Sequence, residues 1–290
     1  MNIRKVAVSG AGQMGSGIAQ VFAAHGFSTV IYDVVPLQLD KSRALTERLL
    51  TRAVDKGKST AEERAATLRN LTWTPDLSVI SEADLVIEAI VERLDTKQQA
   101  WKQVDELCRP TAIFASNTSS LPITQLAASI SHPERFIGMH FMNPVPVMQL
   151  VEVIRGLLTS DDTHQIVMET AQALGKTPVT VNDAPGFISN RVLLPLINEA
   201  IFCLQEGIAT KEDIDMVMKL GMNHPMGPLA LADFIGLDTC LYILEVLQRD
   251  LGEDKYRPAM LLRKMVQGGL LGKKVGRGFY DYAPGLVAAR

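Results

Sequence analysis

The sequence feature that most constrains the fold is a glycine-rich turn, GAGQMG, at residues 10–15. It follows the apolar run Val6–Val8 and precedes apolar residues at helical spacing, so it lies between an expected strand and an expected helix. A lone motif of this kind is weak evidence, but a strand, a glycine-rich turn and a helix in this order are typical of a dinucleotide-binding unit. The motif therefore predicts a Rossmann-type α/β domain.

The residues of this motif have separate expected roles. Gly10 permits the tight turn, Gly12 lets backbone N–H groups approach a pyrophosphate, and Gly15 lets the helix pack closely against the strand. Gln13 and Met14 open the helix, whose N-terminus offers unpaired donors and partial positive charge to the same phosphates. These five residues are the expected backbone and side-chain contacts to a dinucleotide.

An acidic residue follows the next apolar run, at the spacing from the glycine motif that is typical of a ribose-binding residue. Thr29–Tyr32 ends at Asp33, about 20 residues after the glycine motif. This carboxylate can accept hydrogen bonds from both ribose hydroxyls of an adenosine, and it would repel a 2′-phosphate. No cation follows at Val34–Pro36. The sequence therefore favours NAD over NADP.

The composition is that of a globular protein with room for two domains. The chain has 290 residues, of which 47% are hydrophobic and 21% are charged. No stretch approaches the roughly 18 uninterrupted apolar residues of a membrane span. The first apolar residues run directly into the glycine motif, which is unlike a signal peptide. We expect a cytoplasmic protein that does not bind membranes.

The three cysteines do not suggest a disulfide framework or a metal site. Cys108, Cys203 and Cys240 are odd in number and far apart in the sequence. We expect them to be small buried residues, and we expect no bound metal.

Charge is unevenly distributed along the chain. The formal net charge of −3 leaves no global field that would attract nucleic acid. The segment from Lys41 to Arg69, however, holds eight basic and four acidic residues, so it carries +4 against −7 for the remainder. Two interpretations are equally good: a solvated helical hairpin, or a docking site for a phosphorylated ligand.

Strand-like runs alternate with helical patterns in the first part of the chain, which is typical of a doubly wound α/β sheet. A helical hairpin around Pro36 to Arg69, turning near Gly57, is an insertion after the second strand. The break at Asn182–Gly186 ends this domain, which we expect to cover residues 1–183. The expected strands are Lys5–Ser9, Thr29–Asp33, Leu85–Ala89, Ala112–Ser116, Phe136–His140, Leu150–Ile154 and Pro178–Val181.

Residues 184–290 show no further strand pattern and are expected to form an all-α domain. Helices are expected at Phe187–Gln205, Lys211–Leu220, Leu229–Leu251 and Pro258–Gln267. The first of these helices carries nine apolar residues spread around nearly its whole circumference, so it requires burial on nearly all sides. A subunit interface is the favoured cover, which predicts a homodimer joined through this domain.

One histidine and one glutamate are candidates for acid–base chemistry. Of five histidines, only His140 closes a strand-like run, Phe136–Met139, at the sheet edge where a nicotinamide would lie. Glu152 stands inside the apolar run Leu150–Ile154, where a carboxylate requires a partner. It could bond to the imidazole of His140 and stabilise the imidazolium. A pairing with Arg155 is an equal alternative.

A polar cluster follows another apolar run at the same edge. Residues Ser116–Ser120 bring together four hydroxyls and one amide. They could cap a following helix at Thr124–Ile130. In the functional interpretation, at least one hydroxyl contacts the cofactor or the substrate.

Several longer segments are specific enough to compare with a known family. They read GAGQMGSGIAQ, VIEAIVERLDTK, SNTSSLPIT, GMHFMNPVPVMQLVEVIRG, DAPGFISNRVLLPLINEA, MNHPMGPLALADFIGLD and LGKKVGRGFYDY. Together they resemble the 3-hydroxyacyl-CoA dehydrogenases, most closely the single-function bacterial 3-hydroxybutyryl-CoA dehydrogenases, over nearly the entire chain. The resemblance implies an NAD-binding Rossmann domain, a helical dimerisation domain and an acyl-CoA substrate.

The resemblance also implies roles for individual residues. His140 would be the general acid and base, with Glu152 as its partner. Ser119 and Asn190 would contact the reacting oxygen, and Lys56 falls where the family's hairpin meets CoA. The implied cofactor contacts are Gly10, Gly12, Gly15, Asp33, Glu92 and Lys97, with Ser119 and Asn143 near the nicotinamide.

The implied reaction is hydride transfer between C3 of a short-chain 3-hydroxyacyl-CoA and NAD. His140 would take the hydroxyl proton during oxidation and return it during reduction. Asn190 lies beyond the chain break, so the second domain is expected to complete the site and close on the substrate. The alternatives are a sugar-acid or other small hydroxy-acid dehydrogenase, which the basic hairpin disfavours, and a non-catalytic NAD-binding protein.

Overall fold

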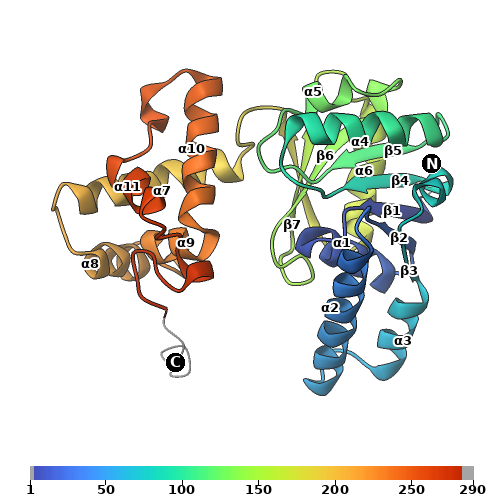
Figure 1. Ribbon diagram of the computed structural model, residues 1–290, viewed down its shortest axis with the longest axis horizontal. Helices are drawn as coiled ribbons and strands as arrows, with labels where there is room; N and C mark the ends of the chain where they lie inside the picture. The colour runs from blue at the N-terminus through green and yellow to red at the C-terminus, as the bar shows by residue number, and fades with distance from the viewer. Residues whose placement is uncertain (1–2, 283–290) are drawn as a thin grey trace. The chain divides into compact units, whose positions relative to one another are not determined.

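The computed structural model describes residues 3–282 of the chain (Figure 1). The chain divides into two compact units, Met1–Ala184 and Pro185–Arg290, and each has its own hydrophobic core. Residues 1–2 and 283–290 of the two expected domains lie outside the described residues.

The first unit is built on one sheet of eight strands in the order β3-β2-β1-β4-β5-β6-β7-β8. The first six strands in this order are parallel to one another. Strand β7 is antiparallel to β6 and parallel to β8. All seven expected strands are confirmed, and β3 was not expected. The bounds are β1 Lys5–Ser9, β2 Ser28–Tyr32, β3 Leu71–Thr74, β4 Leu85–Glu88, β5 Ile113–Ser116, β6 Phe136–Phe141, β7 Leu150–Arg155 and β8 Thr177–Asn182.

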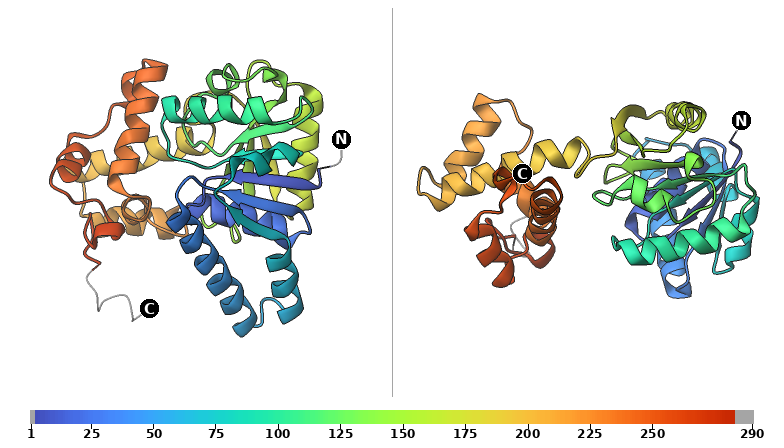
Figure 2. Two further views of the ribbon diagram at one scale, coloured as in Figure 1. Left: turned by 45° about the vertical axis from the view of Figure 1, so that its right-hand side comes forward. Right: turned by 90° about the horizontal axis from the view of Figure 1, so that it is seen from above.

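Helices cover both faces of this sheet (Figures 1 and 2). On one face, Phe22 of α1 and Val167 of α6 belong to the core that includes alternate strand residues. On the other face, the ring of Trp101 of α4 meets the edges of Phe114 and Phe136. Strands buried on both faces explain why the central runs are apolar without alternation. The helices are α1 Gln13–Ala24, α2 Pro36–Asp55, α3 Ala61–Arg69, α4 Leu94–Leu107, α5 Ile123–Ala127 and α6 Asp161–Ala173.

The expected helical hairpin is formed by α2 and α3, which extend away from the sheet (Figure 1). The chain turns at Gly57, whose φ of +64° favours glycine. Thr60 and Glu63 form a reciprocal capping box at the start of α3. The turn of the hairpin and the start of its second helix are therefore both specified by local sequence.

The second unit is all-helical, and among its described residues only isolated β-bridges occur. The expected single helix at Leu229–Leu251 is wrong, because Gly236 adopts φ +106° and divides it into α9 and α10. An α-helix cannot continue through a residue in that conformation. The expected helix at Lys211–Leu220 also ends early and gives way to a π-helical turn at Val217–Gly221. The helices are α7 Ser189–Gln205, α8 Lys211–Met216, α9 Pro228–Ile235, α10 Leu237–Leu251 and α11 Met260–Gln267.

Helix α7 is not buried on all sides within one chain. Leu194, Ile197 and Ile201 are fully enclosed in the core of the second unit. Val192 of this helix and Ile188, which directly precedes it, are in contrast 66% and 48% exposed. The expectation of nearly complete burial is therefore not met by this chain alone.

No helix within residues 3–282 is both long enough and apolar enough to cross a bilayer. In the same part of the chain, no group of three or more His, Cys, Asp or Glu side chains is placed to hold a metal ion. Cys240 is buried as expected, while Cys108 and Cys203 are half-buried, and all three are free thiols.

Candidate active site

The glycine turn has the geometry that a dinucleotide requires. Gly10 adopts φ +109°, and a Cβ there would lie 2.5 Å from the carbonyl oxygen of Ala89. A Cβ on Gly15 would lie 1.8 Å from the carbonyl oxygen of Gly10, so only glycine allows α1 to start so close to β1. A Cβ on Gly12, in contrast, would meet no atom of a non-neighbouring residue within 4 Å, and Gly12 precedes α1 without any side-chain cap. The helix N-terminus is therefore open to a phosphate.

A pocket of about 560 Å³ adjoins this turn. Its walls include Gly10, Gly12, Asp33 and Val35 from the β1 and β2 ends, and Gln99 from α4. Among the described residues that line it there is no lysine or arginine. A ribose with free hydroxyls fits this charge pattern, and a 2′-phosphate does not.

Asp33 is fixed at the wall of this pocket by the backbone. Its Oδ2 accepts a 2.8 Å hydrogen bond from the N–H of Ala11, and its Oδ1 accepts one of 2.9 Å from the N–H of Val35. Burial and the nearby Asp33 charge together raise the pKa of the neighbouring Tyr32 phenol. The carboxylate is thus held in a defined orientation as part of the glycine turn.

His140 and Glu152 are paired, as the functional interpretation of the sequence expected. They stand directly opposite each other on β6 and β7, and His140 Nδ1 lies 2.8 Å from Glu152 Oε2. Both residues are buried, with exposed fractions of 9% and 2%. Arg155, the alternative partner of Glu152, instead binds the Asp161 carboxylate at 2.6 Å. Because β7 runs antiparallel to β6, two residues twelve positions apart in the sequence come into contact.

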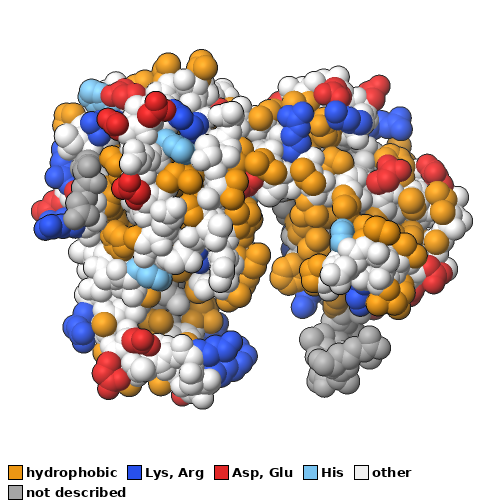
Figure 3. Space-filling view, turned by 180° about the vertical axis from the view of Figure 1, so that it is seen from behind, with side chains coloured by type: hydrophobic (Ala, Val, Ile, Leu, Met, Phe, Trp, Pro, Cys, Tyr) orange, Lys and Arg blue, Asp and Glu red, His pale blue; other side chains and the backbone are white. Residues whose placement is uncertain are grey.

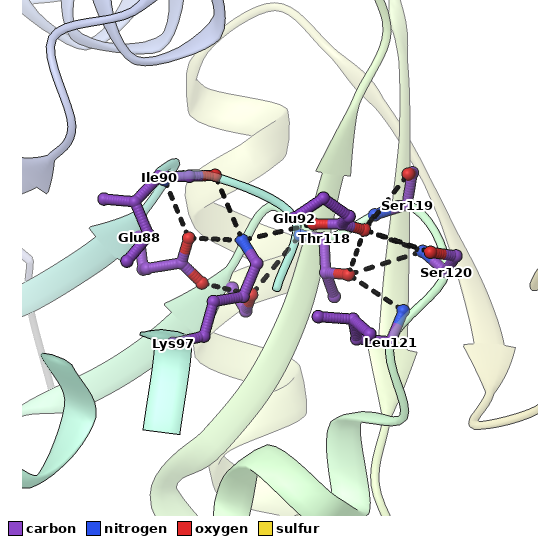
Figure 4. A network of polar contacts seen from close by, with 9 residues as sticks. Glu88, Ile90, Glu92, Lys97, Thr118, Ser119, Ser120 and Leu121 are labelled. Carbon is purple, nitrogen blue, oxygen red and sulfur yellow. Dashed lines mark hydrogen bonds and ion pairs between the residues drawn. The ribbon is translucent and has the colours of Figure 1, made fainter. Parts of the chain in front are cut away.

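The hydroxyl cluster after β5 is organised by a carboxylate (Figure 4). Glu92 Oε1 accepts hydrogen bonds from Thr118 Oγ1 at 2.6 Å, from Ser119 N at 2.8 Å and from Ser120 N at 3.1 Å. The hydroxyls of Ser119 and Ser120 lie 3.2 Å from the same oxygen. Glu92 therefore defines where Ser119 lies.

The helix-capping interpretation of this cluster is wrong. Helix α5 begins after Pro122 without a side-chain cap. Its first N–H groups, those of Ile123 and Thr124, donate instead to the Asp183 carboxylate at 3.1 and 2.8 Å. The hydroxyls before it bind Glu88 at the end of β4 and Glu92 in the turn after that strand.

Lys97 lies behind this cluster, enclosed by two carboxylates. Its Nζ is 2.5 Å from Glu88 Oε1 and 3.2 Å from Glu92 Oε2, and its side chain is only 1% exposed. Glu88 also accepts a 2.7 Å hydrogen bond from Ser116 Oγ. Burial raises the pKa of Glu92, but Lys97 and the donors from Thr118 and Ser119 lower it more, so its net pKa lies below the usual value. Sequence reasoning missed Glu88, although an acid at the end of an apolar strand was a signal for it.

Comparison with known proteins identifies the family. The model of the 3-hydroxyacyl-CoA dehydrogenase NAD-binding domain matches residues 5–184, and that of the family's C-terminal domain matches residues 186–282. The chain belongs to the 3-hydroxyacyl-CoA dehydrogenase family. As a dehydrogenase of this family it uses NAD, in agreement with the Asp33 pocket.

Individual relatives match this dehydrogenase over almost its full length. A probable 3-hydroxybutyryl-CoA dehydrogenase from Bacillus subtilis is 58% identical over 282 residues, which cover 97% of this chain and 98% of the relative. A protein of the same name from Deinococcus radiodurans is also 58% identical, over 96% of this chain and 100% of the relative. The crystal structure of (S)-3-hydroxybutyryl-CoA dehydrogenase from Ralstonia eutropha has a TM-score of 0.96 at 50% identity, covering 98% and 100% of the two chains.

In the dehydrogenase, a side-chain hydrogen bond joins the loop after β6, the strand that carries His140, to the start of α1. Gln13 Nε2 donates a 3.1 Å hydrogen bond to Asn143 Oδ1, and Met14 packs against the sheet core. Asn117 Oδ1 accepts a 2.9 Å hydrogen bond from the N–H of Phe141, next to His140. Asn117 is thus a second residue whose supporting role sequence reasoning did not assign.

The two remaining expected site residues of the dehydrogenase are described within their own units. Asn190 is half-buried in the first turn of α7, in the helical unit. Lys56 is exposed at the C-terminal end of α2, in the first unit. Seven of the eight basic residues of the hairpin are exposed and Arg64 is half-buried. Figure 3 shows Lys and Arg side chains, with Asp and Glu among them, at the end of this hairpin.

Proposed function

We propose that the protein interconverts short-chain (S)-3-hydroxyacyl-CoA, with 3-hydroxybutyryl-CoA as the reference substrate, and the corresponding 3-ketoacyl-CoA. The observation that carries this proposal is the buried His140–Glu152 pair at the carboxyl edge of an NAD-binding sheet. The names of the relatives support the acyl-CoA substrate.

In this proposal His140 is the general acid and base. Bound NAD supplies the hydride acceptor, and its reduced form supplies the hydride donor. With Nδ1 bonded to Glu152, Nε2 exchanges the proton with the substrate oxygen at C3. Glu152 holds the ring in one orientation and stabilises the imidazolium that forms during oxidation.

The remaining residues position substrate and cofactor. We assign Ser119 and Asn190 to the reacting oxygen, and the helical unit that carries Asn190 to completing the site. Glu92, Lys97 and Asn143, with Gln13 and Met14, are assigned to the cofactor side together with Gly10, Gly12, Gly15 and Asp33. Lys56 is assigned to the phosphates of CoA, because residues 41–69 of the exposed hairpin carry a net charge of +4.

We further propose a cytoplasmic homodimer. The exposed apolar side chains of Val192 on α7 and of Ile188, directly before this helix, are candidates for a contact with a second copy. The three free thiols favour a reducing compartment over an oxidising one.

One assay tests the central proposal. NADH oxidation is followed with acetoacetyl-CoA and, separately, with free acetoacetate. We expect rapid turnover of the CoA ester and little of the free acid. A preference for the free acid would favour a small hydroxy-acid dehydrogenase, and NADH binding without turnover of either compound would favour a non-catalytic protein.

A further inference from the structure

We propose that Glu88 and Lys97 are positioning residues for this reaction, and that the buried cluster Glu88–Lys97–Glu92 holds the Ser119 segment from behind. This inference rests on the proposed function, because it concerns how Ser119 is presented to the substrate. It assigns Lys97 a role through Glu92 rather than one in direct contact with the cofactor.

The geometry separates Lys97 from the pocket surface. Its Nζ, at the end of a side chain from α4, points between the two carboxylates in Figure 4. The side chains of Lys97 and Glu88 are 1% and 2% exposed, whereas that of Glu92 is 29% exposed. Glu92 is therefore the member of the cluster that can face both the interior and a ligand.

The contacts of Glu92 favour its ionised form. All its hydrogen bonds to Thr118, Ser119 and Ser120 are bonds that it accepts, and they fall on one oxygen, Oε1. An ionised carboxylate only accepts, whereas a protonated one must also donate. A proton on Oε1 would face the N–H groups of Ser119 and Ser120, and a proton on Oε2 would face the Lys97 ammonium, which cannot accept it. Protonation of Glu92 would therefore weaken its hold on the segment that carries Ser119.

Two carboxylates share the one ammonium of this cluster. Glu88 also accepts hydrogen bonds from Ile90 N at 2.8 Å and Ser116 Oγ at 2.7 Å. The charged groups that face Glu92 are Lys97 directly and Glu88 beyond it, since the adjacent Arg93 pairs with Asp95 at 2.7 Å. Removing the Lys97 charge must raise the pKa of Glu92, whereas removing the Glu88 charge must lower it.

These opposite signs provide the test. Turnover of acetoacetyl-CoA with NADH is measured from about pH 5 to about pH 8, in the direction where His140 has to be protonated, so that acid does not itself remove the proton donor. We expect Lys97→Met to lose at least tenfold in kcat at the acid end and to recover part of it as the pH rises. The exposed Lys102 on the same helix supplies the matched control, Lys102→Met, which should keep the wild-type profile.

Glu88→Gln breaks the same buried cluster without raising the pKa of Glu92. We therefore expect that any loss of kcat in Glu88→Gln is not larger at the acid end than at higher pH. A merely structural role would instead make Lys97→Met and Glu88→Gln lose activity alike at every pH, and that result would overturn the proposal.

A double variant tests whether Lys97 acts through Glu92. We expect Lys97→Met combined with Glu92→Gln to be no slower than Glu92→Gln alone. Losses that multiply would make Lys97 an independent contact and overturn the inference. If Lys97→Met does not fold, Glu92→Gln alone remains decisive, because a wild-type kcat for it would refute any positioning through Glu92.

The two proposals fail in different ways. Absence of turnover by the unmodified protein would overturn the proposed function and this inference with it. Turnover by the unmodified protein, together with a wild-type profile for folded Lys97→Met, would overturn this inference alone.

Discussion

His140 lies directly across the antiparallel β6–β7 pair from Glu152, and its Nδ1 is 2.8 Å from the Glu152 Oε2. Residues in such opposed positions share one face of a sheet, so the backbone register fixes the pair. The dyad is therefore as rigid as the sheet that carries it.

Replacement of either dyad residue should remove activity while leaving the fold intact. We expect His140→Ala to lower kcat by about 10²- to 10⁴-fold, the usual contribution of a general acid–base group. Glu152→Gln keeps the shape but not the charge, and should lower kcat by at least tenfold. Steady-state kinetics with acetoacetyl-CoA and circular dichroism are the measurements.

The same unit offers a matched control for the dyad. His132 and Glu134 form a second His–Glu pair, with side chains 45% and 48% exposed. His132→Ala and Glu134→Gln should leave kcat unchanged. Wild-type turnover by Glu152→Gln would refute the role of the buried pair.

Asp33 should determine the choice of cofactor. Its carboxylate lines the pocket, and a hydrogen bond to a charged group contributes about 1.5–3 kcal/mol. Asp33→Ala should therefore raise KM for NADH by roughly 10- to 100-fold. It should also reduce the preference of the enzyme for NADH over NADPH. Asp40→Ala, at an exposed position of α2, is the control. An unmodified protein that prefers NADPH would contradict the assignment.

The assembly should depend on the exposed side of α7. Light scattering at micromolar concentration should give about twice the chain mass of 31.7 kDa. Val192→Asp should shift the protein toward the monomer, because it places a charge on that surface. Leu157→Asp, at an exposed position of the sheet unit, should not. A monomer of the unmodified protein would exclude the dimer.

The basic hairpin should distinguish a CoA ester from a free acid. Lys56→Glu should raise KM for acetoacetyl-CoA severalfold, more at low salt than at high salt, with kcat little changed. Lys102→Glu, at another exposed position of the same unit, is the control. If Lys56→Glu changed KM equally for acetoacetyl-CoA and acetoacetate, the hairpin would be a solvated charged surface and not a CoA-binding site.

Asp84 should make stability depend on pH. Burial raises its pKa, but the N–H groups of Lys5 and Arg4 and the Arg109 charge lower it more, so the net pKa is below 3.8. Its contribution is therefore complete above about pH 4 and is lost as pH falls through the folded-state pKa. Asp84→Asn should lower the free energy of unfolding by about 1–3 kcal/mol at neutral pH.

Urea unfolding of Asp84→Asn and wild type at neutral and strongly acidic pH measures that effect. The difference between the two proteins should shrink at the acid end. Asp40→Asn should show no difference at either pH. A difference that is constant with pH would mean that packing, rather than the charge of Asp84, is responsible.

The sheet could be predicted because each of its central strands is a short apolar run bounded by turns. The direction of β7 could not, since periodicity does not record whether a strand runs parallel to its neighbour. That direction decided between His140 and Arg155 as the partner of Glu152. The break at Gly236 was missed because the apolar spacing of α9 continues into α10 across the glycine.

The buried ion cluster was the hardest part of the site to predict. A lysine on a largely polar helix is usually taken as solvent-exposed, yet Lys97 projects inward beneath the strand ends. Its partners come from β4 and from the turn after it, and nothing in the local sequence around Lys97 specifies their positions. The resemblance identified Glu92 and Lys97 as important without indicating that they bind each other.

The bonds from Ala11 and Val35 to the two oxygens of Asp33 have a consequence for protein engineering. A carboxylate that is already immobilised has little side-chain entropy left to lose when a ribose binds it. The same bonds tie the glycine turn to the end of β2, so the residue that selects the cofactor also fastens the loop that receives the pyrophosphate. An NADP-accepting variant will therefore need a substitute at residue 33 that still anchors Ala11, or a second change that replaces this anchor.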